Sequence, residues 1–348
     1  MSHVRSSATL LSRITTNVLM NPVMYSTADE DVKLAAVPPT SRACPACGCN
    51  LAKPFLRSRD FFFMRPPLYQ LVRCEDCGLS WLQNAPPIED MASHYGADYD
   101  RVITAPGDLY PHHWDLVRNK LLQYVQGGSI LDIGCSSGSF LRTLKGGAWK
   151  LYGIEMSKVV ADDARATTGA EVFVGDVLEA PFTNNMFDAV SGFHVLEHMY
   201  DPRRVMATVF SWLKAGGILT LTLPNIDSLE ARIFGHYWFG VDVPRHLWHF
   251  SPRALSAMAS SVGFEPVEVG TTRSCYLEGS IRNLVADLKV RSGIPHMPPS
   301  DGKPTALPVR IMQKAFRLGA VYPFRELAVA AGAGADLHAV FRKPRPKT

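Results

Sequence analysis

The sequence predicts an α/β protein with a largely parallel sheet, preceded by a small cysteine-rich module. Short apolar runs alternate with stretches of helical periodicity between residues 129 and 263. Strands that alternate with capped helices form right-handed crossovers, and these build parallel sheets. Two Cys-x-x-Cys pairs lie ahead of this region, between residues 44 and 77. The first pattern predicts the main fold, and the second predicts a metal-binding module before it.

The composition agrees with a globular chain of about two domains. Of the 348 residues, 47% are hydrophobic and 20% are charged, which excludes wholesale disorder and a disulfide-rich miniprotein. The net charge is +4, from 36 basic and 32 acidic residues. So small an excess does not predict a nucleic-acid-binding protein. Since no uncharged apolar run reaches about 18 residues, we expect no membrane-spanning helix.

Residues 1–40 are expected to be a flexible leader. The first 28 residues contain Arg5 and Arg13 and no acidic residue, which faintly resembles a transit peptide. Asn21 and Pro22 interrupt the apolar stretch that a secretory signal would need. A leader without regular structure is therefore the simpler expectation.

The cysteine pairs predict a structural zinc site in a ribbon module over residues 41–82. Each pair is followed by a glycine, which permits the tight turn of a zinc knuckle. Four thiolates complete a tetrahedron and leave no open position for catalysis. Redox or disulfide-forming cysteines are the alternative. Thiolates that bind zinc suit a reducing compartment, so we expect a cytoplasmic protein. The predicted ligands are Cys44, Cys47, Cys74 and Cys77.

Residues 83–128 are expected to be a helical linker that also serves as a lid. Two consecutive prolines break the chain near its start, and Trp114–Val125 has the pattern of an amphipathic helix. Tyr95 and Tyr99 are candidates for covering a ligand pocket, although ordinary packing explains them equally well.

The central region has five predicted strands and clear helix starts. Ser157, Asp201 and Ser251 are expected N-caps, and the last two are followed by proline at the first helical position. Ligands of parallel sheets bind beyond the carboxyl ends of the strands, so we expect the chemistry in the following loops. The predicted strands are Ser129–Ile133, Leu151–Glu155, Glu171–Gly175, Phe187–Gly192 and Gly217–Leu223.

The first of these loops does not match a dinucleotide fingerprint, because Ser136 and Ser139 occupy two of its three glycine positions. Asp132 lies two residues before the first glycine, which suits a ligand that carries an ammonium group. Glu155 ends the second strand, 23 residues later, where it could accept both hydroxyls of a ribose. Asp176 follows the third strand and could accept from an adenine amino group.

The order and spacing of these residues, with the histidine-rich turn after the fourth strand, resemble the class I S-adenosylmethionine-dependent methyltransferases. The resemblance covers residues 129–270, and Leu337–Lys343 is similar to the closing antiparallel strand of that family. It implies a Rossmann-like, seven-stranded, mostly parallel sheet over 129–343. It also implies S-adenosylmethionine as cofactor. The sequence departs from the family pattern at the middle glycine of the first loop, which is Ser136.

The resemblance also implies a set of cofactor-binding residues, carried over position by position. Asp132, Gly134, Ser136 and Gly138 would surround the methionine moiety, Glu155 would bind the ribose, Met156, Asp176 and Val177 would lie at the adenine, and His194 would lie near the sulfonium.

The zinc module placed before the catalytic fold narrows the resemblance to a subgroup. The segment Asp242–Ser251 resembles a motif that such enzymes carry. Many of them are bacterial and modify sugars, precursors of cell-surface polysaccharides or secondary metabolites. The resemblance therefore implies a small-molecule acceptor.

The acceptor hydroxyl needs a base as its bond to carbon forms, and histidine is the suitable side chain. We expect His246 to be that base and Arg245 to orient an anionic group of the acceptor, such as a sugar-nucleotide phosphate. His194 and His198 are further catalytic candidates. The alternatives are that Arg245 and His249 brace their loop, or that His246 and His249 bind a metal, for which no third ligand is evident.

A helical insertion is expected over 271–335, before the last strand, with a short tail at 344–348. Residues 303–325 contain five basic residues and no acid. A basic amphipathic helix could contact an anionic membrane, but a solvated charged face is the commoner explanation.

The sequence thus predicts a methyltransferase, most simply acting on a hydroxyl of a sugar, a polysaccharide precursor or a secondary metabolite. One alternative is an RNA methyltransferase whose zinc ribbon, with the aromatic residues 61–63, holds nucleic acid. Another is a cofactor-binding scaffold without catalysis. The oligomeric state is not predicted.

Overall fold

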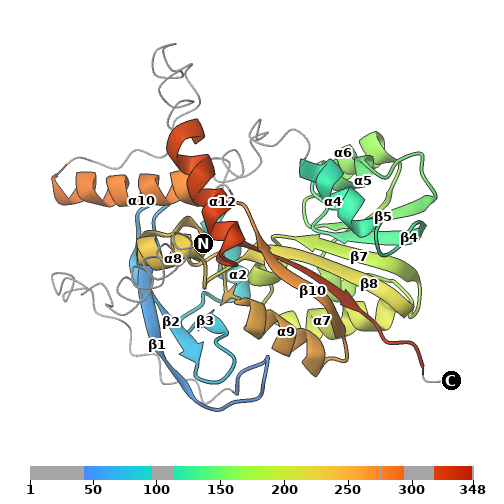
Figure 1. Cartoon of the computed structure of the whole chain (residues 1–348), viewed down its shortest axis with the longest axis horizontal. Coiled ribbons are helices and arrows are strands. Elements are labelled where there is room, and N and C mark those ends of the chain that lie inside the picture. The colour runs from blue at the N-terminus through green and yellow to red at the C-terminus, as the bar shows by residue number, and fades with distance from the viewer. Residues whose placement is uncertain (1–42, 96–112, 275, 294–316, 347–348) are drawn as a thin grey trace, which may run out of the picture. The chain divides into compact units, whose positions relative to one another are not determined.

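The computed structural model describes residues 43–95, 113–274, 276–293 and 317–346. Its main element is a seven-stranded sheet with the order β10-β11-β8-β7-β4-β5-β6 (Figure 1). Neighbours from β8 to β6 are parallel, and β11 is antiparallel to both β8 and β10. This confirms the predicted Rossmann-like sheet with an antiparallel closing strand. The strands are β4 (Gly128–Ile133), β5 (Trp149–Glu155), β6 (Glu171–Val174), β7 (Phe187–Phe193), β8 (Leu213–Pro224), β10 (Glu265–Thr272) and β11 (Asp336–Arg342).

Helices cover both faces of this sheet, as its apolar central strands require. One face packs with the buried residues of α7 (Pro202–Trp212) and α9 (Pro252–Ser261). The other packs with α5 (Ser139–Arg142) and α6 (Lys158–Thr168). Loops, rather than helices, lie at the carboxyl ends of the parallel strands.

The three predicted N-caps are confirmed. The side chain of Ser157 accepts from the amide of Val160 at 3.5 Å. In the same way, Asp201 accepts from the amide of Arg204 at 3.0 Å, and Ser251 accepts from the amide of Ala254 at 3.1 Å. Each bond satisfies an amide that has no partner within its helix. The caps therefore fix where α6, α7 and α9 begin relative to the strand ends.

The N-terminal cysteine module forms a second sheet with the order β1-β2-β3-β9. Three of its strands are local: β1 (Ala52–Asp60), β2 (Arg65–Cys74) and β3 (Ser80–Leu82). The fourth, β9 (Trp248–His249), comes from the segment after β8. Cysteines of the module also share one buried cluster with residues of α7 and α9. The module therefore packs as one body with the main fold, although the sequence suggested a domain boundary at residue 82.

Strand β10 was not predicted from the sequence. It lies at the edge of the sheet, where β11 is its only partner among the strands that the structure describes, and none of its residues is buried. A half-exposed edge strand lacks the continuous apolar run that marked the other strands. Within 271–335, the described part contains α10 (Tyr276–Arg291), the π-helix η7 (Arg317–Val321) and α12 (Tyr322–Ala330).

The predicted linker contains α2 (Ile88–Met91), η2 (Ala92–His94) and α4 (His113–Leu121), so the helix expected at 114–125 ends earlier. After β8 come α8 (Leu229–Phe234), η5 (Gly235–Tyr237) and η6 (Phe239–Val241). Two further short 3-10 helices, η3 (Val177–Glu179) and η4 (Leu196–His198), follow β6 and β7.

Several predictions lie outside the described residues: the leader at 1–40, Tyr99, and 303–316 of the basic segment. Within that segment Arg325 is described, and it is buried against Glu278. Among the described helices, none combines the length and the apolarity needed to cross a bilayer.

Candidate functional site

The loop after β4 has the conformation that its glycines permit. Gly134 has a φ of +68°, and a Cβ atom there would lie 2.5 Å from Cγ2 of Val195. Gly138 has a φ of +78°, and its Cβ would lie 2.6 Å from Cγ2 of Thr168. Ser136 also adopts a left-handed φ, of +49°. The missing middle glycine therefore does not prevent the sharp turn expected of this loop.

Glu155 lies at the end of β5, where two backbone amides hold its carboxylate. Ser136 donates to Oε2 at 3.1 Å, and Ser157 donates to Oε1 at 2.9 Å. Both carboxylate oxygens are thereby oriented next to the glycine loop. Met156, expected beside the adenine, is 69% exposed in this structure. An exposed apolar side chain at a strand end suits contact with a flat ligand.

Asp132 is 2% exposed, and its Oδ1 accepts from Oγ of Ser191 at 2.7 Å. Burial raises the pKa of this carboxyl to about 7; the Ser191 bond lowers it and the charge of Glu155 raises it. The group thus titrates near neutrality. A neighbouring ammonium group would favour its charged form.

Asp176 begins η3, and its Oδ1 accepts from the amide of Leu178 at 2.7 Å. Val177, the next residue, is buried. The two residues expected at the adenine therefore follow β6 directly, one polar and one apolar. The order of strands puts β6, β5, β4 and β7 side by side, so these loops share the carboxyl edge of the sheet.

His194 follows β7 with a left-handed φ of +55°. Its Nδ1 lies 3.5 Å from Oε1 of Glu197, and its Nε2 lies 3.8 Å from Oδ2 of Asp336. Burial opposes a charged ring here, but the two carboxylates outweigh it and raise the pKa of His194 to about 9. The imidazole is therefore mostly protonated at neutral pH. A protonated ring is a hydrogen-bond donor and not a base.

Glu197 and His198 of η4 form a compact cluster with His246. One ligand atom of each lies within 4.8 Å of those of the other two. Glu197 is fully buried; burial would raise the pKa of its carboxyl, but His194, His198 and His246 lower it to about 2. Burial and His246 lower the pKa of His198 to about 4. The cluster thus holds a carboxylate and, at His198, a neutral imidazole.

Arg245 is 1% exposed and lies between two carboxylates. Asp60 accepts from Nη1 and Nη2 at 3.0 Å each, and Asp242 accepts from Nε and Nη2. His249 donates from Nε2 to the carbonyl of Val241 at 2.9 Å. This arrangement favours the interpretation that Arg245 and His249 brace their loop, over the expectation that Arg245 meets an anionic acceptor.

The four predicted zinc ligands come together. Sγ of Cys44 lies 3.5 Å from that of Cys77, and Sγ of Cys47 lies 3.6 Å from that of Cys74. All four sulfurs lie within 4.8 Å of one another. A disulfide would need about 2.05 Å, whereas a zinc ion with Zn–S bonds of about 2.3 Å separates its sulfurs by about 3.8 Å. The arrangement therefore fits a tetrahedral zinc ion.

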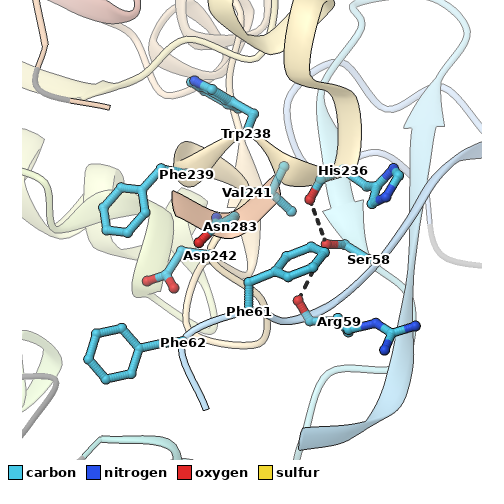
Figure 2. A pocket seen from close by; sticks show the side chains of 10 residues that line it. All are labelled: Ser58, Arg59, Phe61, Phe62, His236, Trp238, Phe239, Val241, Asp242 and Asn283. Carbon is cyan, nitrogen blue, oxygen red and sulfur yellow. Dashed lines mark hydrogen bonds between the residues drawn. The ribbon is translucent and has the colours of Figure 1, made fainter. Parts of the chain in front are cut away.

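A small pocket lies where β1 meets the segment after α8 (Figure 2). Oγ of Ser58 donates to the carbonyl of His236 at 3.0 Å, so part of its polar wall is already paired. None of the strand-end residues lines it. The lining residues are Ser58, Arg59, Phe61, Phe62, His236, Trp238, Phe239, Val241, Asp242 and Asn283.

Two contributors were not predicted as site residues. Glu197 was not among the predicted site residues, although an acid beside His198 and three residues after His194 is a sequence signal for a shared site. Asp60 gave no local signal, because its partner Arg245 lies 185 residues away.

Comparison with known proteins identifies the central region. Residues 110–269 match the family model described as "Methyltransferase domain". Over 170 residues the chain is 23% identical to a protein of Mycolicibacterium smegmatis named "Probable S-adenosylmethionine-dependent methyltransferase", covering 47% of this chain and 63% of that one. It is 33% identical over 110 residues to an uncharacterized 37.1 kDa protein of Streptomyces fradiae, covering 30% of this chain and 32% of that one. The chain thus spans less than two thirds of either relative.

Among solved structures, phosphoethanolamine N-methyltransferase 2 of Haemonchus contortus in complex with S-adenosyl-L-methionine superposes with a TM-score of 0.49. It is 17% identical, over 76% of this chain and 62% of that one. Residues 110–269 match a methyltransferase domain, and the described part of this region has the strand order of the class I, S-adenosylmethionine-dependent methyltransferases that it resembles.

Proposed function

We propose that the protein is an S-adenosylmethionine-dependent methyltransferase that acts on a hydroxyl group of a sugar, a polysaccharide precursor or a secondary metabolite. The observation that supports this most directly is the pairing of the glycine loop with Glu155. The amides of Ser136 and Ser157 orient that carboxylate at the end of β5. A carboxylate held in this way can accept two vicinal ribose hydroxyls.

The other strand ends would complete the binding of the cofactor. Asp132 would accept from its ammonium group, and Asp176 and Val177 would contact its adenine. When bound, S-adenosylmethionine supplies a methyl group that is already activated by the sulfonium. The residues of the protein therefore have to align the acceptor and exclude water.

The acceptor hydroxyl must lose its proton as the new bond forms. His246 is the expected base, and its Nδ1 donates to the carbonyl of Gly240 at 2.9 Å, which leaves Nε2 to accept. His194, with its raised pKa, would instead stabilise negative charge near the sulfonium. These roles agree with the positions of both rings close to Glu197.

We further propose that Cys44, Cys47, Cys74 and Cys77 hold a structural zinc ion and that the protein works in the cytoplasm, where thiolates stay reduced. Each knuckle is closed by a glycine amide that donates to the carbonyl of the first cysteine, at 2.8 Å for Gly48 and 3.2 Å for Gly78. Four thiolates leave zinc no open position, so the ion would stabilise the N-terminal sheet.

The structure gives less support to RNA as acceptor. Phe61 and Phe62, two of the three aromatic residues that could stack on bases, are 8% and 6% exposed. Stacking requires an exposed ring. The internal pairing of Arg245 likewise removes the residue expected to hold a phosphorylated acceptor, so an uncharged hydroxyl acceptor is favoured.

Calorimetry with S-adenosylhomocysteine tests the cofactor, and transfer of labelled methyl groups to a panel of sugars and metabolites tests the reaction. Glu155→Ala should weaken the affinity at least tenfold. The matched control is Glu171→Ala. Glu171 is the first residue of β6, at the edge of the sheet away from the glycine loop, and forms an exposed ion pair with Lys150. No heat with the wild-type chain would overturn the proposal. Binding without transfer to any acceptor would favour the scaffold alternative.

A further inference from the structure

We propose that Glu197, His198 and His246 bind a divalent metal ion. Glu197 and His198 lie in η4, directly after β7, and His246 lies in the loop before β9. Two segments almost 50 residues apart thus bring two imidazoles and one carboxylate together, with a ligand atom of each within 4.8 Å of the others. Ligand atoms about 2.1 Å from one ion lie at most about 4.2 Å apart. A contraction of about half an ångström would close the site.

The hydrogen bonds of the two histidines select the tautomer that a metal ligand needs. Nδ1 of His198 donates to the carbonyl of Arg245 at 3.0 Å, and Nδ1 of His246 donates to the carbonyl of Gly240 at 2.9 Å. A carbonyl can only accept, so each ring carries its proton on Nδ1 and has a lone pair on Nε2. Histidines that bind metals characteristically donate their other N–H to such an acceptor.

Glu197 supplies the second, independent observation. Its side chain is 0% exposed, yet neither carboxylate oxygen has a hydrogen-bond partner among the described residues. Nδ1 of His194 lies 3.5 Å from Oε1 of Glu197. The positive charge of His194 favours the carboxylate form, but both oxygens still lack the hydrogen bonds that buried polar atoms normally have. Coordination of a cation would give these oxygens a partner.

The donor set indicates the class of metal. Two imidazole nitrogens and one carboxylate oxygen suit zinc, manganese or iron in the divalent state and leave positions open for another ligand. The four thiolates of the cysteine site favour zinc and leave no such position. The two sites therefore differ in both selectivity and coordination.

The role of this ion rests on the proposed function. We place the acceptor hydroxyl at an open position of this ion, because His194, expected near the sulfonium, lies 3.5 Å from Oε1 of Glu197. An acceptor hydroxyl bound there would have a lowered pKa and lose its proton to water. Its oxygen would then attack the methyl carbon as the carbon–sulfur bond breaks, and the electron pair would remain on sulfur. The products are a methyl ether and S-adenosylhomocysteine. In this form of the reaction the Nε2 lone pair of His246 would hold the metal, and water would take the proton that His246 takes in the metal-free reaction proposed above.

Metal counting tests the site without reference to activity. The full chain is dialysed against micromolar zinc chloride, and its metal content is measured by mass spectrometry. Protein whose cysteine site already holds zinc is also titrated with manganese chloride and followed by electron paramagnetic resonance. We expect one ion per chain in addition to the cysteine-bound zinc, in the zinc experiment, in the manganese experiment or in both. No additional ion with either metal would overturn the proposal.

The variants Glu197→Gln, His198→Gln and His246→Gln should each lose the additional ion and keep the cysteine-bound zinc. His249→Gln is the matched control, because His249 lies on the same segment, is buried, and donates to a carbonyl. It should keep both ions. If the control loses the ion too, or if no cluster variant loses it, the ligand assignment is wrong. Thermal unfolding of each variant checks that it is folded.

Calorimetry with S-adenosylhomocysteine on the same samples separates this inference from the proposed function. Variants that lose the ion and still bind S-adenosylhomocysteine would support both. A chain that binds S-adenosylhomocysteine but no additional ion would overturn the metal site alone. A chain that binds the additional ion but no S-adenosylhomocysteine would overturn the proposed function and leave the site standing.

Discussion

Arg245 and Asp60 are joined by two parallel hydrogen bonds of 3.0 Å, each side chain being 1% exposed. The pair links the last residue of β1 to the segment that carries His246. Arg245 also contacts Asp242 and the carbonyl of His94. One guanidinium therefore connects the N-terminal sheet, the linker and the loop beside the candidate metal site.

Asp60→Asn should destabilise the protein by about 3 kcal/mol or more, since it leaves a buried guanidinium with one carboxylate instead of two. Urea unfolding measures the loss. The control is Lys53→Gln, which breaks the exposed pair of Lys53 and Glu75 and should change stability by less than about 1 kcal/mol. Equal effects of the two substitutions would show that the buried pair does not brace the loop.

Cys44→Ser should remove the thiolate-bound zinc and unfold the N-terminal sheet. Because Cys44 belongs to the buried cluster that includes α7 and α9, the melting temperature of the main fold should fall as well. Zinc analysis and hydrogen exchange of β2 amides measure the two effects. Cys49→Ser is the control: Cys49 is half-buried and bonded to Leu51, and it should leave the zinc in place. Full zinc content in Cys44→Ser would contradict the cysteine assignment.

The sequence predicted those parts of the fold that depend on local patterns. Continuous apolar runs identified the buried central strands, and serine or aspartate before a helical period identified the N-caps that the structure confirms. Strand β10 escaped because an edge strand buries too little to show such a run. Strand β9 escaped because two residues are too short for any period.

The candidate site likewise contains some residues that local patterns predict and others that they do not. Strand-end residues such as Glu155 were predictable, because the topology alone brings the carboxyl ends of parallel strands to one edge. The partners of Arg245 were not, since Asp60 lies 185 residues away and no local pattern relates them. Glu197 was visible as an acid between histidines. That it is buried without hydrogen bonds is a property of the packing only.

Gly134→Ala should lower stability by more than the 1–2 kcal/mol or so that a left-handed alanine costs, because the added Cβ would also meet Val195 at 2.5 Å. The loop must then move, and the affinity for S-adenosylhomocysteine should fall at least tenfold. Gly169→Ala is the matched control: its φ is +77°, and nothing lies within 4 Å of its Cβ. It should lose about 1 kcal/mol and keep its affinity. Equal affinities of the two variants would separate this loop from the cofactor.

Asp132 should make cofactor binding depend on pH. Burial raises the pKa of its carboxyl from 3.8 to about 7 in the free protein, so the group is mostly protonated at pH 5.5. The ammonium group of S-adenosylhomocysteine favours the charged carboxylate, so binding below pH 7 must release a proton. Affinity should therefore fall by up to about tenfold per pH unit as the pH decreases from 7.

Calorimetry in two buffers of different ionisation enthalpy would detect the released proton. Asp132→Asn has no proton to release, so its affinity should be lower at pH 8 and flat between pH 5.5 and 8. The same carboxyl affects folding with a definite sign: the folded state binds the extra proton between pH 3.8 and about 7, so stability decreases as the pH rises through that window. Asp132→Asn should lack this decrease. A wild-type affinity that does not change with pH would place the ammonium group away from Asp132.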